Sequence, residues 1–333
     1  LLGSSDFSAR KQSISEWNNA NPHQQRGIAI TPVKFGISFT LKHYNQAGAL
    51  VLIYADGSVQ VNHGGTEMGQ GLHTKVLSVT MRELGLPADR IRLMHTRTDK
   101  VPNTSATAAS CGSDLNGMAV ADACAQLRNR LAPVAAAMLR CAESDLTYSN
   151  GGIHGGGRIV PFDDLIVKAY TERIQLSAAG FYKTPDLEWD WSQPNPKGKP
   201  FHYFAFGAAV SEVEVDTLTG MHHLRRVDIL HDAGNSLAPA IDRGQIEGGF
   251  VQGAGWLTSE ELMWNDDGAL LTHSASTYAI PTISDAPLDF RVDLLTDAAQ
   301  RSTIHGSKAV GEPPLMLAIS VREALRAAGR STS

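Results

Sequence analysis

The chain has 333 residues, of which 42% are hydrophobic and 19% are charged, and its formal net charge is -5. This composition is typical of a globular protein with a large core and excludes an intrinsically disordered chain. The acidic balance without a basic run argues against nucleic acid binding. Neither a membrane-spanning apolar stretch nor a signal-peptide pattern is recognisable, so we expect a cytoplasmic protein with no membrane partner.

The chain opens with a polar segment that resembles a linker. Residues 8–21 begin like a helix and break at Asn21-Pro22. We therefore interpret residues 1–26 as a segment that connects a preceding domain to the rest of the chain. From Gly27 onward the sequence is rich in β-branched and aromatic residues, which favours a strand.

A hairpin and a glycine-rich loop follow. Residues 49–54 and 58–62 alternate in polarity on either side of Asp56-Gly57, a pair typical of hairpin turns. The loop at residues 63–71 then leads into a predicted helix at residues 72–84. Its glycines match neither the dinucleotide nor the Walker spacing. They can bring backbone N–H groups close to an anion or allow close packing, and both interpretations stay open.

A second loop, built from small residues, precedes a long predicted helix. Residues 102–114 are dense in Ser, Thr and Ala, and residues 115–141 form an Ala-rich helical stretch that contains Pro133, a helix-breaking residue. A helix cap needs a single polar residue, such as Ser113 or Asp114, and this run is far longer. The excess of hydroxyl and N–H donors favours a cradle for an anion.

Helices and strands continue to alternate in the middle of the chain. We expect a helix at residues 162–174, a strand at residues 174–182, and a hairpin formed by residues 201–215 and 221–231. Residues 186–199 hold two tryptophans and two prolines, and we interpret them as an irregular lid or a partner contact.

Residues 239–256 form a predicted helix with several glycines. Isolated glycines are costly inside a helix, so a helix that contains them usually lets a ligand or another backbone approach closely. Gln252 lies on this small-residue surface and can donate a hydrogen bond to a buried polar ligand.

A stiff carboxylate lies between a glycine and two prolines near the end of the chain. Pro313 biases Glu312 towards extended backbone, and Pro314 suits the first turn of a helix expected at residues 315–328. A carboxylate held at such a junction, beside apolar residues, is a candidate general base. A solvated carboxylate in a rigid turn is the alternative.

The cysteines and histidines show no metal-binding motif. Cys111, Cys124 and Cys141 fit neither a disulfide framework nor a zinc or iron–sulfur spacing. No histidine pair has the H-E-x-x-H spacing. We therefore expect reduced thiols and no metal held by protein side chains.

Five motifs in order resemble one family, the molybdenum-binding subunit of xanthine dehydrogenase, in the xanthine oxidase and aldehyde oxidase superfamily. The motifs are KFGISFT at 34–40, GTEMGQGLHTK at 65–75, TAAS at 107–110, GFVQG at 249–253 and SKAVGEPPL at 307–315. The resemblance implies the C-terminal molybdopterin-binding domain of that subunit, at residues 27–333. The implied fold is mixed α/β (α+β), with mixed sheets, packed helices and two subdomains.

The resemblance also implies a cofactor, molybdenum-molybdopterin. In this family the dithiolene sulfurs of the pterin hold the molybdenum and no protein side chain does, which agrees with the missing metal motif. The residues that the resemblance assigns to the cofactor are Gly69, Gln70, Thr107, Ala108, Ala109, Ser110 and Gln252.

Glu312 falls on the general base of the family. The resemblance implies that it takes a proton from a Mo–OH group whose oxygen attacks an electron-poor ring carbon, while hydride passes to a sulfido ligand. The implied reaction is oxidation of hypoxanthine or xanthine to urate. Phe39 is expected to pack against the purine, Thr40 to hydrogen-bond it and Ala109 to border it.

The resemblance implies that the site is completed elsewhere. The family carries a second glutamate and an arginine on the N-terminal half of the molybdenum subunit. Three scattered cysteines cannot hold iron–sulfur clusters, so 2Fe-2S, FAD and NAD are expected on other domains or on an iron–sulfur/FAD subunit. We expect this chain to be inactive alone and to act in a heteromeric dimer of assemblies.

Two alternatives stay open. The first is an aldehyde or other N-heterocycle hydroxylase of the same superfamily, which assays with xanthine and with aromatic aldehydes would distinguish. The second is a non-catalytic scaffold fragment that keeps the fold without the cofactor, which molybdenum analysis of the assembled complex would distinguish.

Overall fold

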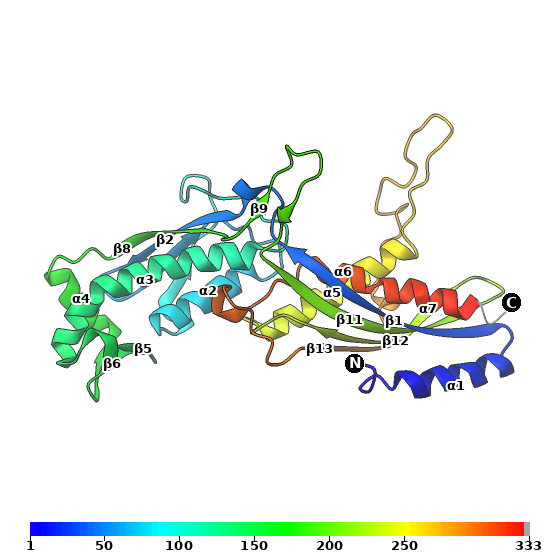
Figure 1. Cartoon of the computed structure of the whole chain (residues 1–333), viewed down its shortest axis with the longest axis horizontal. Coiled ribbons are helices and arrows are strands. Elements are labelled where there is room, and N and C mark those ends of the chain that lie inside the picture. Colours follow the sequence, from blue (N-terminus) through cyan, green and yellow to red (C-terminus); the bar gives the residue numbers. More distant parts are fainter. Residues whose placement is uncertain (330–333) are drawn as a thin grey trace.

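Two lobes lie end to end along the long axis of the molecule (Figure 1). The computed structural model describes residues 1–329. The first lobe is formed mainly by residues 38–202, and the second contains both ends of the described chain. The mixed sheets with packed helices confirm the predicted fold class. The proposed boundaries at 26/27 and 333 stay a prediction, and residues 330–333 lie outside the described residues.

The helices are α1 Phe7–Ala20, α2 Leu72–Leu84, α3 Gly112–Leu139, α4 Phe162–Thr171, α5 Pro239–Leu257, α6 Pro313–Leu317 and α7 Ile319–Gly329. The strands are β1 Gln24–Ile37, β2 Gln46–Ile53, β3 Val59–His63, β4 Ile91–Leu93, β5 Thr147–Ser149, β6 Gly152–Gly155, β7 Arg158–Pro161, β8 Ser177–Lys183, β9 Glu188–Trp189, β10 Gly198–Lys199, β11 Tyr203–Asp216, β12 His222–His231 and β13 Asp289–Leu294. The 3₁₀ turns are η1 Lys42–Tyr44, η2 Ala88–Arg90, η3 Glu143–Asp145, η4 Ile283–Asp285 and η5 Ile304–Gly306.

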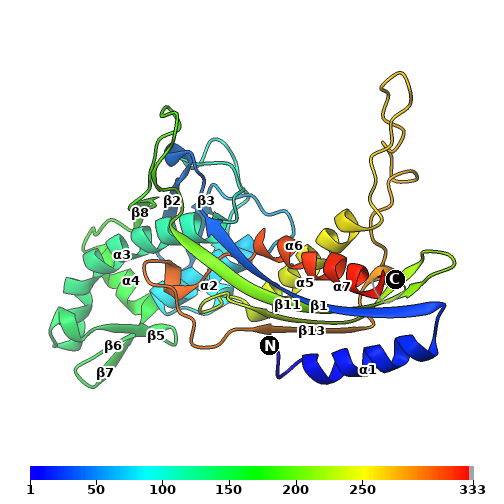
Figure 2. The same cartoon turned by 45° about the vertical axis from the view of Figure 1, so that its right-hand side comes forward.

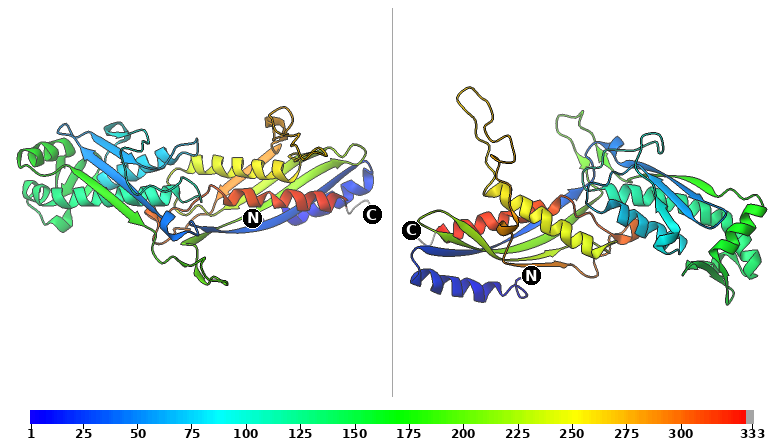
Figure 3. Two further views of the ribbon diagram at one scale, coloured as in Figure 1. Left: turned by 90° about the horizontal axis from the view of Figure 1, so that it is seen from above. Right: turned by 180° about the vertical axis from the view of Figure 1, so that it is seen from behind.

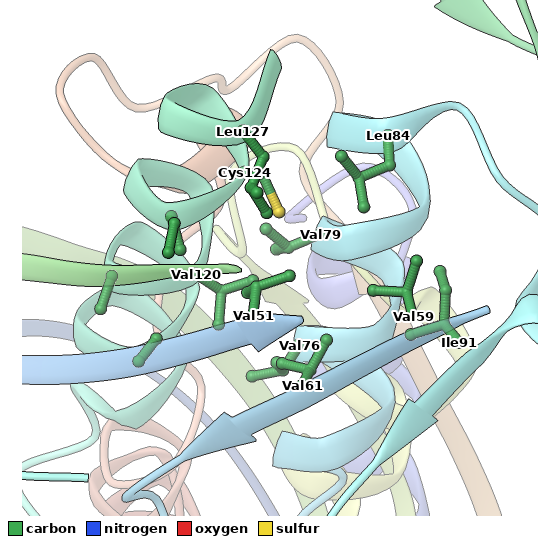
Figure 4. Close-up of a cluster of buried hydrophobic side chains, with 14 of the residues drawn as sticks. Val51, Val59, Val61, Val76, Val79, Leu84, Ile91, Val120, Cys124 and Leu127 are labelled. Carbon is green, nitrogen blue, oxygen red and sulfur yellow. The ribbon is translucent and has the colours of Figure 1, made fainter. Parts of the chain in front are cut away.

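The first lobe is a sheet of order β4-β3-β2-β8 packed against α2 and α3. β2 and β3 form the predicted hairpin, in which Val51 pairs with Val61. Because side chains alternate across a strand, both valines point to the helix-covered face and meet Val76, Val79 and Val120 in the core (Figure 4). The small sheet β5-β6-β7 and α4 lie at the far end of this lobe.

Helix α3 is longer than predicted. It begins at Gly112 rather than residue 115 and continues through Pro133 without a break. Pro133 lies on the exposed face, and so does Asn129, whose carbonyl loses its helical donor. Water can hydrogen-bond that carbonyl, which makes the proline tolerable.

The second lobe is a sheet of order β1-β11-β12-β13. Figure 2 shows α5, α6 and α7 on one face of this sheet and α1 on the opposite face. Gly27 in β1 permits the contact with α7, since a Cβ there would lie 2.0 Å from the carbonyl oxygen of Ala324. On the other face Ile14 of α1 packs with Ile28 and Val210.

The helix predicted at residues 315–328 is two helices. α6 begins at Pro313 and ends at Leu317, and α7 begins at Ile319. The prediction placed the helix start two residues late because Pro313 occupies the N1 position itself, where the missing N–H costs nothing.

Two irregular segments project from the lobes. Residues 258–288, between α5 and β13, form an arm that extends away from the body (Figure 3). Residues 186–199 contain the short strand pair β9-β10, and the rings of Trp189 in β9 and Trp191 in the loop after it meet edge to face. Their role as a lid or a partner contact stays a prediction. No helix in residues 1–329 is long and apolar enough to cross a membrane.

Candidate functional site

A cavity of about 280 Å³ lies where the two lobes meet. The first lobe contributes the loops that precede α2 and α3, and the second contributes α5 and the segment before α6. The structure thereby brings together predicted site residues from distant parts of the chain. Those that line the cavity are Gln70, Thr107, Ala108, Ala109, Ser110 and Glu312.

Ser110 ties Glu312 to the loop before α3. The Ser110 hydroxyl donates to Glu312 Oε2 at 2.7 Å, and Ser110 Oγ accepts the Glu312 N–H at 2.8 Å. Glu312 has φ -99° and ψ -37°, in the helical region. The prediction of extended backbone at Glu312 was therefore wrong. These two hydrogen bonds, together with the bond from Leu315 N–H to the Glu312 carbonyl, override the local bias of Pro313.

The backbone before α3 is strained where it meets Glu312. Ala109 and Ser110 have φ values of 53° and 57°, in the left-handed region that side chains other than glycine rarely adopt. Such strain persists only where the surroundings impose it, and it is concentrated at functional sites. Here it turns the Ser110 hydroxyl towards Glu312. Gly311 keeps this approach possible, because a Cβ there would lie 2.9 Å from Ser110 Oγ.

The first turn of α3 presents backbone N–H groups to the cavity. The N-cap residue Cys111 makes no side-chain cap hydrogen bond, and both Gly112 and Ser113 line the cavity. The N-terminus of this 28-residue helix carries partial positive charge. Uncapped N–H groups at such an end bind anions, which is the arrangement that a cradle for an anionic ligand requires.

The glycine-rich loop before α2 is held by the carboxylate of Glu67. Its N–H groups at Gly69, Gly71 and His73 are already bonded to the Glu67 carboxylate, at 2.8–2.9 Å. Burial raises the pKa of Glu67, but these three backbone donors outweigh it, and the pKa lies below its ordinary value. Of the two interpretations left open for these glycines, the bonds to Glu67 do not favour a contact of these three N–H groups with an anion. Gly69 itself is exposed and does not line the cavity.

The same loop is joined to the loop before α3. Thr107 Oγ1 accepts the Thr66 N–H at 2.9 Å. The Gln70 side chain folds over its own loop, where Oε1 accepts the Met68 N–H at 2.5 Å and Nε2 donates to the Thr66 carbonyl at 2.8 Å. The two loops therefore form one wall of the cavity.

Replacing Glu67 by Gln is expected to loosen this wall. An amide offers one acceptor oxygen, so either the His73 N–H or the pair at Gly69 and Gly71 loses its partner. We expect the free energy of unfolding to fall by about 1–3 kcal/mol. Hydrogen exchange at these three amides should accelerate, while exchange in α4, in the same lobe, should not change. Unchanged protection of all three amides would contradict this role of Glu67.

Helix α5 contributes Gln245 to the cavity rather than Gln252. Gln252 is exposed and lies two turns further along the same face of the helix. The sequence reasoning missed Gln245, although its spacing of seven residues from Gln252 places both on one face. The predicted contact between Gln252 and a cofactor stays a prediction.

The glycines of α5 allow the segment that carries Glu312 to dock. A Cβ at Gly253 would lie 2.3 Å from the Leu315 carbonyl oxygen, and one at Gly249 would lie 3.1 Å from Pro314 Cβ. The close approach predicted for this helix is therefore made by the backbone of α6.

A buried ion pair connects α2 with α5 beside the cavity. Lys75 Nζ lies 2.5 Å from Asp242 Oδ1, and both side chains are almost fully buried. Ser236 donates its hydroxyl to Asp242 Oδ2 at 2.5 Å. Lys75 is the only cationic residue among the described residues that line the cavity, and sequence analysis did not single it out.

Phe39 and Thr40 lie just after β1, outside the residues that line the cavity. The Phe39 ring is partly buried and meets Tyr44 edge to face, with the ring centroids 5.4 Å apart. The backbone N–H of Phe39 donates to Asn45 Oδ1 at 2.9 Å. Contact between these two residues and a substrate stays a prediction.

No group of three or more His, Cys, Asp or Glu side chains in residues 1–329 is arranged to hold a metal ion. Burial raises the pKa of the Cys111 and Cys124 thiols to about 12, which keeps both protonated at neutral pH. The cavity thus offers N–H groups, hydroxyls, amides, one lysine and one carboxylate. Such a set suits a polar, anionic organic ligand.

Comparison with known proteins assigns the chain to a family. Residues 1–287 match the family model described as the molybdopterin cofactor-binding domain. The chain is 49% identical to the xanthine dehydrogenase of Oryza sativa subsp. japonica over 333 residues, and 50% identical to the xanthine dehydrogenase/oxidase of Gallus gallus over 325 residues. Each alignment covers 98% of this chain but only 23% and 22% of the respective relative.

Solved structures share the fold. Quinoline 2-oxidoreductase from Pseudomonas putida 86 superposes with a TM-score of 0.86 at 24% identity, covering 98% of this chain and 42% of that one. A Cu,Mo-CO dehydrogenase superposes with a TM-score of 0.83 at 23% identity, covering 99% and 41%. The chain therefore belongs to the molybdopterin cofactor-binding domain family, and it corresponds to less than a quarter of the length of the xanthine dehydrogenases that it matches.

Proposed function

We propose that this chain is the C-terminal molybdenum-cofactor-binding part of a xanthine dehydrogenase-type hydroxylase, which oxidises hypoxanthine and xanthine to urate. One observation carries the proposal: Glu312, from the second lobe, is held by Ser110 at the cavity edge beside the uncapped N-terminus of α3. A carboxylate beside a helix end that can bind an anion supports the proposal, and so does the 49% identity to a xanthine dehydrogenase.

The residues of the cavity fit molybdopterin. Ala108, Ala109, Gly112 and Gly311 leave room for a bulky ligand against the backbone. The N-terminus of α3 favours a phosphate, because it carries partial positive charge. The amides of Gln70 and Gln245 supply neutral donors. When bound, the cofactor would supply the two-electron oxidation of a substrate carbon.

Glu312 has one oxygen available for proton transfer. Its Oε2 accepts from Ser110, whereas its Oε1 has no hydrogen-bond partner in the described part of the chain. A positioned carboxylate with a free oxygen can take the proton from the attacking hydroxyl group, and such general base catalysis contributes about 10²–10⁴-fold to the rate. The Ser110 bond fixes the direction of the carboxylate.

Further contacts complete the proposed site. In the proposal Phe39 packs against the purine ring, Thr40 hydrogen-bonds it and Ala109 borders it. Gly69 and Gln252 extend the cofactor contact beyond the cavity. The remaining purine contacts lie on the N-terminal half of the molybdenum subunit, and 2Fe-2S, FAD and NAD lie on other domains. The assembly is cytoplasmic.

Molybdenum analysis tests the proposal. The assembled enzyme should contain molybdenum in proportion to this chain and should oxidise xanthine faster than aromatic aldehydes. The isolated chain should contain little molybdenum, because in the proposal the N-terminal half of the molybdenum subunit supplies the rest of the site. An assembled complex without molybdenum would leave only a scaffold, and faster oxidation of aldehydes would assign the other substrate class.

A further inference from the structure

Three segments far apart in the sequence meet at one phenolic oxygen below the cavity. Tyr203 is the first residue of β11, and its side chain is buried. Its hydroxyl donates to Asp114 Oδ2 at 2.7 Å and accepts the Ala309 N–H at 2.8 Å. Asp114 belongs to the first turn of α3, and Ala309 lies three residues before Glu312.

The chemistry of the three groups fixes the direction of both hydrogen bonds. A backbone N–H can only donate, so the Tyr203 oxygen must accept from Ala309. The single hydroxyl proton is then left for Asp114. Removing the Tyr203 oxygen would therefore leave the Ala309 N–H and the Asp114 carboxyl group unpaired in a buried place.

Asp114 is costly to bury. It forms no ion pair within residues 1–329, and burial raises its pKa to about 7 against the opposing effects of the Tyr203 hydrogen bond and Lys75. A carboxyl group in this position lowers the stability of the fold compared with an apolar residue of similar size. A gain in stability therefore does not explain why Asp114 is buried beside Tyr203. Its hydrogen bond orients the Tyr203 hydroxyl group, and this does explain it.

Ala309 lies in the segment that leads to Glu312. The Lys308 ammonium group is held by Asp232 Oδ2 at 2.5 Å and by the Phe204 carbonyl at 3.1 Å. Beyond it, Val310 and Gly311 line the cavity. The Ala309 N–H bond to Tyr203 is thus the last fixed point of the backbone before the Ser110 contact at Glu312.

We propose that Tyr203, oriented by Asp114, is a positioning residue for Glu312. It connects the wall formed by α3 with the segment formed by residues 308–312, and so sets the distance between the carboxylate and the cavity. This inference rests on the proposed function, in which Glu312 is the general base. Tyr203 does not touch the substrate and acts only through the backbone that it holds.

A double-mutant cycle in the assembled, cofactor-loaded enzyme tests the proposal. Tyr203→Phe should lower kcat by about 10- to 100-fold, because displacement of a catalytic group by about 1 Å has effects of this size. KM and molybdenum content should stay unchanged. In a Glu312→Gln background the same Tyr203→Phe change should have almost no further effect, since coupled residues are non-additive. An equal loss in both backgrounds would overturn the proposal.

Two further comparisons keep the test decisive. Tyr148→Phe is the matched control, because the Tyr148 hydroxyl is buried in the first lobe without a partner among the described residues, and kcat should not change. Asp114→Asn should retain most of kcat, because its carbonyl oxygen can still accept from Tyr203, whereas Asp114→Leu should lower kcat as Tyr203→Phe does. If Tyr203→Phe does not retain molybdenum, the comparison of Asp114→Asn with Asp114→Leu replaces it as the test. Equal kcat of these two Asp114 variants would overturn the proposal. Near-normal turnover of Glu312→Gln alone would instead remove Glu312 as the general base that the proposed function assumes.

Discussion

A Glu312→Gln variant of the assembled enzyme is expected to turn over about 10²–10⁴-fold more slowly than the wild type. The amide cannot take a proton from an attacking hydroxyl group, but it has nearly the same shape and can still bond the Ser110 hydroxyl. Molybdenum content and the free energy of unfolding should therefore stay close to those of the wild type. Steady-state turnover, normalised to molybdenum, measures the effect.

The matched control is Glu323→Gln. This carboxylate lies on α7, in the same C-terminal segment, and among residues 1–329 it pairs only with Arg322 and Arg326 at the surface. Its replacement should leave turnover unchanged, since exposed ion pairs contribute little. If both variants had similar turnover, Glu312 would have no role as a base and would be a structural residue of the turn.

Replacing either of two glycines of α5 by alanine is expected to change the free energy of unfolding, in opposite directions at the two positions. Gly253→Ala should lower the free energy of unfolding by about 1–3 kcal/mol or more, because the new Cβ would lie 2.3 Å from the Leu315 carbonyl oxygen and one of the two helices must shift. Gly248→Ala should raise it by about 1 kcal/mol, since no atom of residues 1–329 lies within 4 Å of a Cβ there and alanine favours the helix.

Urea denaturation of the two variants checks this expectation, and turnover of the assembled enzyme adds a second measurement. Gly253→Ala should also lower turnover, because Leu315 follows Glu312 by three residues and moves with it. Gly248→Ala should not. Destabilisation of both variants by the same amount would mean that the glycines serve the helix in general and not the docking of α6.

Much of the fold follows from local patterns. The β2-β3 hairpin was predicted because alternating polarity and Asp56-Gly57 are features of adjacent residues, and α2 was predicted at its observed bounds of Leu72–Leu84. Where a prediction failed, a distant contact decided the outcome. Pro313 should keep Glu312 extended, but Ser110, which is 202 residues away, holds it in the helical region.

The site was predictable only in part, because motifs are local in the sequence whereas the contacts between them are not. Motifs identified Ser110 and Glu312, and the structure brings them together. Sequence reasoning missed Gln245, because the cavity-facing turn of α5 depends on how that helix packs against the rest of the protein. It missed Tyr203 as well, because its partners Asp114 and Ala309 are 89 and 106 residues away.

The position of the cavity between the lobes makes ligand binding and lobe docking thermodynamically linked. Residues of both lobes line the cavity, so its shape depends on how the lobes dock. A ligand that binds only the docked arrangement stabilises it by RT ln(1 + [L]/Kd), about 2.7 kcal/mol at a ligand concentration of 100 Kd. By the same linkage, whatever weakens the Lys75–Asp242 pair between α2 and α5 weakens the affinity of the ligand, even without touching it.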